Sequence, residues 1–90
     1  MSFGRKIVFS AECDAAAEAL GGYIRIDCTL DGAMDALMRN PYGFPLLQSD
    51  WYSVRYIVTK PVAGVPALAW FFTIDGRDVT IQYVEEYQGY

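Results

Sequence analysis

The sequence contains no histidine, and its 90 residues include only two cysteines, Cys13 and Cys28. Without histidine, Ser-His-Asp and Cys-His catalysis are excluded, and the commonest metal ligand in proteins is missing. Two cysteines are too few for a zinc site or a disulfide scaffold, so we expect both to be small buried hydrophobic residues. We expect no metal and no other cofactor, and any acid–base chemistry would have to come from carboxylates, lysine or tyrosine.

Long hydrophobic runs are also missing, because no stretch approaches the roughly 20 apolar residues of a transmembrane helix. The first ten residues include Arg5 and Lys6 but lack a long apolar segment and a small-residue cleavage site, so they do not match a signal peptide. We therefore expect no membrane partner and a cytoplasmic location.

Basic residues are few, with seven Lys and Arg against eleven Asp and Glu, for a net charge of −4. This balance counts against strong nucleic-acid binding, which depends on basic side chains that neutralise phosphates, although a small local basic site is compatible with it. Apolar residues, in contrast, make up 53% of the chain, and seven Tyr, five Phe and two Trp are among them. This is enough for the core of a single domain over residues 1–90, and the aromatics suit either that core or an interface.

The first half of the chain predicts one strand followed by helical segments. The apolar run at residues 5–10 predicts a strand. Ser10 is suited to cap a helix whose first turn contains Glu12 and Asp14. Gly21-Gly22 then ends that helix.

Residues 23–30 fit two patterns. Apolar and polar residues alternate over them, which is typical of a strand. An apolar stripe at spacings of three and four instead indicates one helix over residues 22–39; it consists of Tyr23, Ile26, Leu30, Ala33 and Leu37. Asp31-Gly32 interrupts that helix, so a shorter helix over residues 32–39, capped by Asp31, is a further alternative. Either helix ends before Asn40-Pro41.

The second half predicts a loop over residues 41–50 and then an antiparallel meander of three strands at 51–59, 67–75 and 78–87. The middle strand is almost wholly apolar and is therefore expected at the centre. Asp75-Gly76 is a strong hairpin-turn signal.

The alternation of residues assigns side chains to the two faces of this meander. On the first strand we expect Tyr52, Val54, Tyr56 and Val58 on one face and Ser53, Arg55, Ile57 and Thr59 on the other. On the last strand Val79, Ile81 and Tyr83 are expected to share a face, and Val84 breaks that pattern. We expect four aromatic side chains to line one face of the sheet: Tyr52, Tyr56, Trp70 and Phe72. Core packing under the helices is the main interpretation of this face, and a groove for a partner is the alternative.

Four segments together resemble the RelE/ParE superfamily of toxins from toxin–antitoxin modules. They are KIVFSAECDAAAEAL at 6–20, AMDALMRNPYGFPLL at 33–47, SVRYIV at 53–58 and AWFFTIDGRDVTIQYVEEY at 69–87. The resemblance implies an α+β fold in which an N-terminal strand and a helical hairpin at positions 11–39 pack on the C-terminal three-stranded antiparallel meander. It thereby favours the helical interpretation of residues 23–30.

The resemblance also implies a function. Toxins of this kind act on translation, as mRNA endoribonucleases at the ribosome, or on gyrase, and a cognate antitoxin protein neutralises them. The ribonucleases are usually basic near the end of the last strand, where this chain instead reads Val84-Glu85-Glu86-Tyr87. Carboxylates there oppose the stabilisation of developing negative charge. The alternative is therefore a non-enzymatic protein-interaction module, with a homodimer as one form, that has lost the toxin chemistry.

Five residues are candidates for a functional site. Arg55 and Tyr87 are the catalytic candidates, Arg55 as a phosphate contact and Tyr87 as a proton donor. Lys60, Arg77 and Tyr90 are candidates for binding RNA or a partner protein. The simpler interpretations are that Arg55 pairs across the sheet with one of the two adjacent glutamates, that the tyrosines cover the sheet edge, and that the loop charges are solvated.

Overall fold

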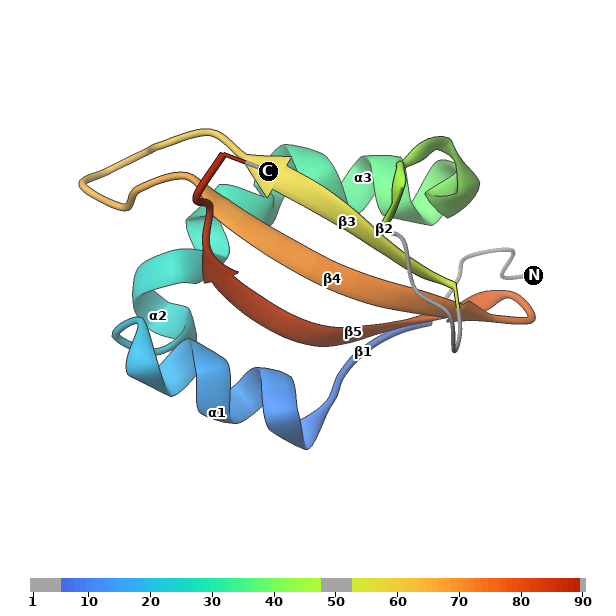
Figure 1. Ribbon diagram of the computed structural model, residues 1–90, viewed down its shortest axis with the longest axis horizontal. Helices are drawn as coiled ribbons and strands as arrows, with labels where there is room; N and C mark the ends of the chain where they lie inside the picture. Colours follow the sequence, from blue (N-terminus) through green and yellow to red (C-terminus); the bar gives the residue numbers. More distant parts are fainter. Residues whose placement is uncertain (1–5, 48–52, 90) are drawn as a thin grey trace.

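The computed structural model describes residues 6–47 and 53–89, and its elements form an α+β structure (Figure 1). The helical elements are α1 (Ala11–Ala19), α2 (Tyr23–Ile26), the 3-10 helix η1 (Asp27–Leu30), α3 (Asp31–Arg39) and the 3-10 helix η2 (Pro41–Gly43). The strands are β1 (Ile7–Phe9), β2 (Leu46–Leu47), β3 (Val54–Thr59), β4 (Leu68–Asp75) and β5 (Asp78–Glu86). No helix in the described part of the chain is long and apolar enough to cross a membrane.

The strands form one five-stranded mixed sheet in the order β1-β5-β4-β3-β2. The antiparallel meander of β3, β4 and β5 is confirmed, with β4 in the middle and Gly76-Arg77 as the turn between β4 and β5. β1 pairs with β5 in parallel, and β2 pairs with β3 antiparallel. The expected strand count is wrong because β2 lies inside residues 41–50, which the sequence assigns to a loop. Two residues are too few for alternation to reveal a strand.

The helical interpretation of residues 23–39 is confirmed, and the strand interpretation of residues 23–30 is wrong. α2, η1 and α3 follow one another without a break. The predicted stripe faces the core, since Ile26, Leu30 and Leu37 are buried and the other two members pack against them. α3 begins at Asp31 without a side-chain cap, so the shorter helix with Asp31 as its cap is not what forms.

Helix α1 begins and ends where the sequence predicts. The Ser10 hydroxyl accepts a hydrogen bond from the Cys13 backbone N–H at 3.1 Å and donates one to the Gln82 carbonyl at 2.9 Å. One side chain therefore caps the helix and ties its start to β5. At the other end Gly21 and Gly22 adopt φ values of +104° and +88°, which any other residue would adopt only with strain.

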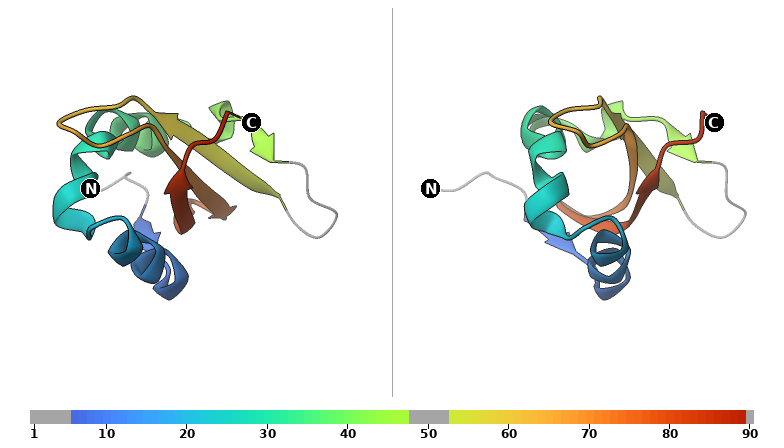
Figure 2. Two further views of the ribbon diagram at one scale, coloured as in Figure 1. Left: turned by 60° about the vertical axis from the view of Figure 1, so that its left-hand side comes forward. Right: turned by 90° about the vertical axis from the view of Figure 1, so that its left-hand side faces the viewer.

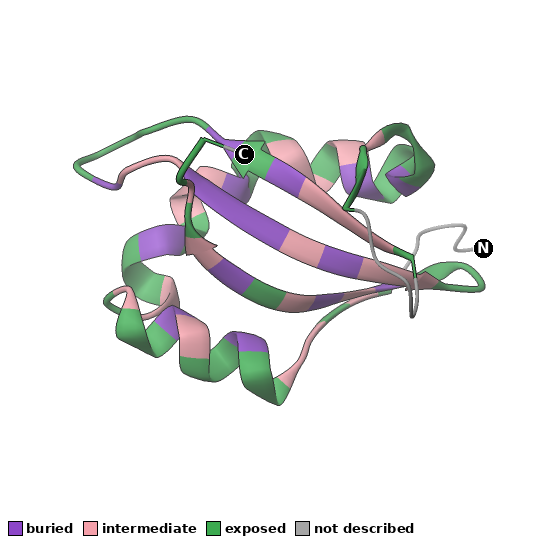
Figure 3. Cartoon of the chain, viewed as in Figure 1, coloured by how far each residue is buried: buried purple, intermediate pink, exposed green. Residues whose placement is uncertain are grey.

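The described helices cover one face of the sheet and leave the other, here called the open face, without a helix. In Figure 1, α3 lies behind β3 and α2 lies at the left end of the sheet, and Figure 2 shows that the concave side of the curved sheet faces these helices. α1 packs along β5. The purple bands of buried residues in Figure 3 mark this core. Its members from the sheet include Ile57, Leu68, Trp70, Phe72, Val79, Ile81 and Val84.

A β-bulge in β5 changes which side chains reach the open face. Phe72 pairs with Ile81 but Phe71 pairs with Tyr83, so Gln82 is an extra residue between them. The extra residue puts Tyr83 on the open face and turns Val84 into the core. The prediction that Tyr83 shares a face with Ile81 is therefore wrong. The break in alternation at Val84 is the feature of the sequence that indicates the bulge.

The expected aromatic face is also corrected. Tyr56 lies opposite Phe71, whereas Trp70 lies opposite Ile57 and Phe72 lies opposite Arg55. Opposite residues point to the same side of a sheet, so Tyr56 faces the open side while Trp70 and Phe72 face the helices. Because β4 is apolar on both sides, its sequence does not show which of its side chains face the helices. Tyr52 lies outside the described residues.

Candidate functional site

Three aromatic side chains form a row across the open face, one from each strand of the meander. The ring centroids of Tyr56 and Phe71 are 6.3 Å apart, and those of Phe71 and Tyr83 are 6.4 Å apart. Tyr83 is 44% exposed, although it stands in the middle of a strand. Aromatic side chains on an uncovered sheet face are typical of a surface that binds a partner.

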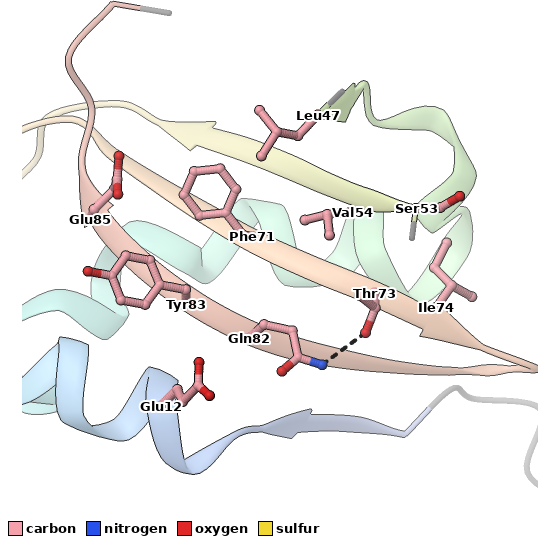
Figure 4. Close-up of a pocket in the computed structure, with 10 residues that line it drawn as sticks. All are labelled: Glu12, Leu47, Ser53, Val54, Phe71, Thr73, Ile74, Gln82, Tyr83 and Glu85. Carbon is pink, nitrogen blue, oxygen red and sulfur yellow. Dashed lines mark hydrogen bonds between the residues drawn. The ribbon is translucent and has the colours of Figure 1, made fainter. Parts of the chain in front are cut away.

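An open groove of about 670 Å³ lies along this row (Figure 4). Phe71 and Tyr83 line it with their rings, and Leu47 of β2 and Val54 of β3 line it with aliphatic side chains. β2 was not predicted, and its contribution is to extend the apolar floor beyond β3. The volume falls within the range of about 300–1,000 Å³ that is usual for ligand sites.

The bulge contributes an amide side chain to the groove. Gln82, the extra residue of β5, projects on the open side, and its Nε2 donates a hydrogen bond to the Thr73 hydroxyl at 3.1 Å (Figure 4). This bond spans β4 and β5 and holds the bulge in one geometry. It leaves the amide oxygen of Gln82 as an acceptor on the groove surface.

Two carboxylates also line the groove. Glu12 comes from the first turn of α1 and Glu85 from β5, and in Figure 4 they lie on either side of the Tyr83 ring. Among the described residues, no lysine or arginine lines the groove. These side chains offer no cation for a phosphate, which counts against RNA binding at the groove.

Arg55, a predicted catalytic residue, lies on the face covered by the helices. Its guanidinium donates hydrogen bonds to the Phe44 carbonyl at 2.6 Å and to the Tyr42 carbonyl at 3.2 Å. The guanidinium carbon is also 5.4 Å from the centroid of the Tyr42 ring. These contacts join the segment after α3 to the sheet, so the geometry indicates a structural use for Arg55.

The predicted pairing of Arg55 with Glu85 or Glu86 is wrong. Arg55 lies opposite Phe72, while the two glutamates lie opposite Ala69 and Leu68. The offset of three or more residues separates them by about 10 Å along the strands alone. Glu85 also faces the open side, away from the Arg55 guanidinium.

The other predicted site residues are dispersed. Tyr87 follows β5, where its backbone N–H donates to the Ala67 carbonyl at 2.9 Å, and it is half-buried. Lys60 is exposed just after β3, near the same end of the sheet, whereas Arg77 is in the turn at the far end of β4. A strand of eight residues spans about 25 Å, so these two basic residues do not converge. Tyr90 lies outside the described residues.

A small polar cluster lies beneath α1, away from the groove. The Tyr23 hydroxyl donates a hydrogen bond to the Asp14 carboxylate at 2.7 Å. Burial, and next the hydrogen bond to Asp14, raise the pKa of Tyr23 well above its ordinary value. Burial also raises the pKa of the Cys13 thiol, and this outweighs the lowering by its hydrogen bond with Tyr23. A thiol kept protonated is a poor nucleophile, so this cluster is suited to packing. Cys13 is buried as predicted, while Cys28 is only partly buried.

The residues that build the groove were for the most part not singled out by sequence reasoning. Glu12 reads as an ordinary helix-start residue, and Tyr83 was assigned to the wrong face. The one available signal was the broken alternation at Val84, which indicates a bulge in the last strand.

No candidate metal site is found within residues 6–47 and 53–89, because no three acidic or cysteine side chains there are grouped so that they could hold an ion. Comparisons with known proteins add no relative, because no protein-family model, curated protein or solved structure matches the chain.

Proposed function

We propose that this chain is a protein-interaction domain related to RelE/ParE toxins, which binds a segment of a partner protein across its open sheet face. The observation that carries the proposal is the aromatic row of Tyr56, Phe71 and Tyr83 beside a groove on a face that no described helix covers. Rigid aromatic side chains supply much of the binding energy at protein interfaces.

The relationship to RelE/ParE toxins is supported by the order of elements. A short strand is followed by a helical segment, a second helical segment and an antiparallel meander, and the helical part packs on one face of the sheet. In a toxin–antitoxin module the partner would be the antitoxin, lying on the sheet as an extended or helical segment.

The dispersal of the basic residues supports binding over catalysis. Cleavage of RNA requires donors that converge on the developing negative charge of the phosphate. Here Arg55 bonds to backbone carbonyls on the covered face, and Lys60 and Arg77 lie at opposite ends of β4. The groove contains carboxylates where such chemistry would need cations.

Substitution of the aromatic row tests this proposal. The chain is co-expressed with the product of its neighbouring gene, and complex formation and self-association are measured by analytical ultracentrifugation. Tyr83→Ser and Phe71→Ser should abolish the complex or the homodimer, whereas Ile24→Ser should not, since Ile24 is 97% exposed and does not line the groove. Association that survives both groove substitutions, or a parent protein that neither dimerises nor binds that product, would overturn the proposal.

The rival proposal is an active toxin that acts on translation or on gyrase, with Arg55 and Tyr87 in catalysis. Its support is the same element order. Expression in bacteria distinguishes the two: an active toxin arrests growth, and Tyr87→Phe relieves the arrest while leaving the protein folded. Normal growth with the parent chain would refute the proposal of an active toxin and leave the binding proposal unaffected.

A further inference from the structure

The edge of the sheet along β3 is paired over only part of its length. β2 pairs with the first two residues of β3, and the Pro45 carbonyl, just before β2, accepts a hydrogen bond from the Tyr56 N–H at 3.1 Å. Proline has no N–H to continue the ladder, and the chain before it forms η2. The last residues of β3 therefore lie at an edge that no described strand covers.

The ladder determines which backbone groups point outward at this edge. In an antiparallel strand, alternate residues bond to opposite sides. The Tyr56 N–H points to the β2 side, so the backbone of Val58 points there too. Ile57 and Thr59 bond to β4 instead. The N–H and C=O of Val58 thus project from the edge, and no described residue bonds to them, which makes them a template for a further strand.

A cleft lies beside this edge, between β3 and the helical segment behind it. It has a volume of about 330 Å³ and is here called the edge cleft. Val58 and Lys60 line it from the strand side, while Thr29, Gly32 and Ala33 line it from η1 and α3. Figure 1 shows α3 behind β3. A Cβ at Gly32 would meet no atom within 4 Å, so the space beside this glycine is open.

A strand added at this edge would direct alternate side chains to the two sides of the sheet. Ile57 and Thr59 are buried, so residues opposite them would also point to the helix side. There Gly32 and Ala33 leave room for small apolar side chains. A residue opposite Val58 would point to the other side, next to the Val58 side chain, which is 40% exposed.

Lys60 adds a charge at one end of the edge cleft. It is the one charged side chain among the described residues of the lining, and it forms no ion pair with the described part of the chain. A carboxylate directly opposite Lys60 in an added strand would pair with its ammonium. A second copy of this chain, placed with Val58 opposite Val58, would put Tyr56 opposite Lys60 instead of a carboxylate. The charge therefore favours a different partner.

Lysine and proline at a sheet edge can also prevent strand pairing, and Pro61 follows Lys60. Pro61 lies beyond the last residue of β3, however, and removes no N–H from the strand itself. The N–H and C=O of Val58 stay exposed in either case, so the two interpretations differ in whether a segment binds there.

We propose that the edge cleft binds an extended segment of a partner protein, which adds to β3 as an antiparallel strand. The segment has an acidic, a small, a β-branched and a small residue, which lie in that order opposite Lys60, Thr59, Val58 and Ile57. In the antiparallel direction one residue bonds to both the N–H and the C=O of Val58, and β2 already pairs with β3 in this direction. This site is separate from the open-face groove, and neither proposal depends on the other.

Amide hydrogen exchange tests the unpaired edge first. In the full-length ¹⁵N-labelled chain, the Val58 amide should exchange at least about tenfold faster than those of Ile57 and Thr59, which bond to β4. Equally slow exchange of Val58 would overturn the proposal, because the edge would then be paired within the chain. Exchange that slows as the protein concentration rises would also overturn it, because a second copy would then cover the edge.

Matched peptides test the added strand. The probe is acetyl-Thr-Glu-Ala-Val-Ala-Thr-amide, and two further versions carry an N-methyl group on the valine or on the alanine after it. Methylation of the valine removes the N–H that bonds to the Val58 carbonyl, whereas the N–H of that alanine points away from β3. In NMR titrations the probe should shift the Val58 amide and slow its exchange. The valine-methylated peptide should bind about tenfold more weakly than the alanine-methylated one.

Three variants locate the bound segment. Lys60→Gln should weaken the probe about two- to fivefold and leave a version with glutamine in place of glutamate unchanged. Lys6→Gln is the matched control, because Lys6 is exposed next to β1 at the opposite edge of the sheet, and it should change neither peptide. Gly32→Leu places a side chain in the open space beside α3 and should abolish binding. Its melting temperature should stay equal or rise, because leucine favours a helix more than glycine does.

The outcomes separate this proposal from binding at the open face. No shift of the Val58 amide at millimolar peptide, equal binding of the two methylated peptides, or binding that survives Gly32→Leu would overturn the edge cleft as a site. Equal effects of Lys60→Gln and Lys6→Gln would overturn the acidic position of the segment. Tyr83→Ser, which changes the open-face groove, should leave the binding of the probe unchanged.

Discussion

Replacement of Arg55 by methionine distinguishes a structural from a catalytic role for the strand arginine. The guanidinium binds the Phe44 and Tyr42 carbonyls and lies over the Tyr42 ring. Methionine keeps most of the aliphatic packing and removes these three interactions. The segment after α3 would then be held to β3 by backbone contacts alone: the Tyr56 N–H, which donates to the Pro45 carbonyl at 3.1 Å, and the pairing of β2 with β3.

The expected loss follows from the three interactions. The bond to Phe44 is short, at 2.6 Å, and charge-assisted, so it contributes about 1.5 kcal/mol, at the low end of its class because the side chain keeps contact with water. The longer bond to Tyr42, at 3.2 Å, contributes less, and an exposed cation–π contact contributes about 0.5 kcal/mol. Together they predict a loss of about 2 kcal/mol, or a fall in melting temperature of about 8–16 °C for a domain of this size.

Urea unfolding of the parent and the variants measures this loss. Tryptophan fluorescence reports the transition, because Trp70 is fully buried in the folded protein. Arg39→Met is the matched control: Arg39 pairs with Asp35 at 3.2 Å, but both side chains are highly exposed, so its loss should stay below about 0.5 kcal/mol. Arg55→Lys should be intermediate, since a lysine keeps the charge but not the planar set of donors.

Two results would refute this reasoning. A loss below about 0.5 kcal/mol for Arg55→Met would show that the carbonyl contacts contribute little. A variant of unchanged stability that nevertheless loses a toxic activity would favour the catalytic interpretation of Arg55.

Three further predictions concern the folded state. Ser10→Ala removes the cap of α1 and the bond to the Gln82 carbonyl, so urea unfolding should show a loss of about 1–2 kcal/mol, and Ser10→Thr should recover part of it. Gly76 has φ +64° in the β4–β5 turn, so Gly76→Val should lower the melting temperature, whereas Gly76→Asn should lower it much less; equal effects would contradict the turn geometry. Burial raises the pKa of the Cys13 thiol above its ordinary 9.0, so in the native protein Cys13 should resist iodoacetamide while Cys28 reacts, as peptide mass mapping would show. Above that pH the unfolded thiol releases its proton and the native thiol keeps it, so stability should fall as pH rises, and a constant stability across this window would contradict the shift.

Much of the fold follows from local patterns. The stripe containing Ile26, Leu30 and Leu37 indicates the helical stretch, Ser10 marks the start of α1, and Asp75-Gly76 marks the hairpin. Each signal involves residues close in the chain, whose preferences hold in any context that buries the apolar side. Where two local patterns competed, over residues 23–30, burial against the sheet decided in favour of the helix.

The site depends on contacts that are distant in the chain. Glu12 and Tyr83 line the same groove only because α1 packs along β5, and no feature of the sequence near either residue predicts that they do. The partners of Arg55 are backbone carbonyls, which every residue possesses and which therefore leave no pattern in the sequence. β2 is recognisable only through its pairing with β3.

The sequence by itself determined the order and type of most elements, the absence of histidine chemistry and the negative charge of the chain, because these depend on composition and on periodicity along the chain. The tertiary structure alone decided which side chains share the open face. The bulge at Gln82 turned Tyr83 out and Val84 in, and one inserted residue reverses every later side chain of a strand. Pairing between strands fixes such a register, and for this reason the aromatic groove and its two carboxylates became visible only in the folded protein.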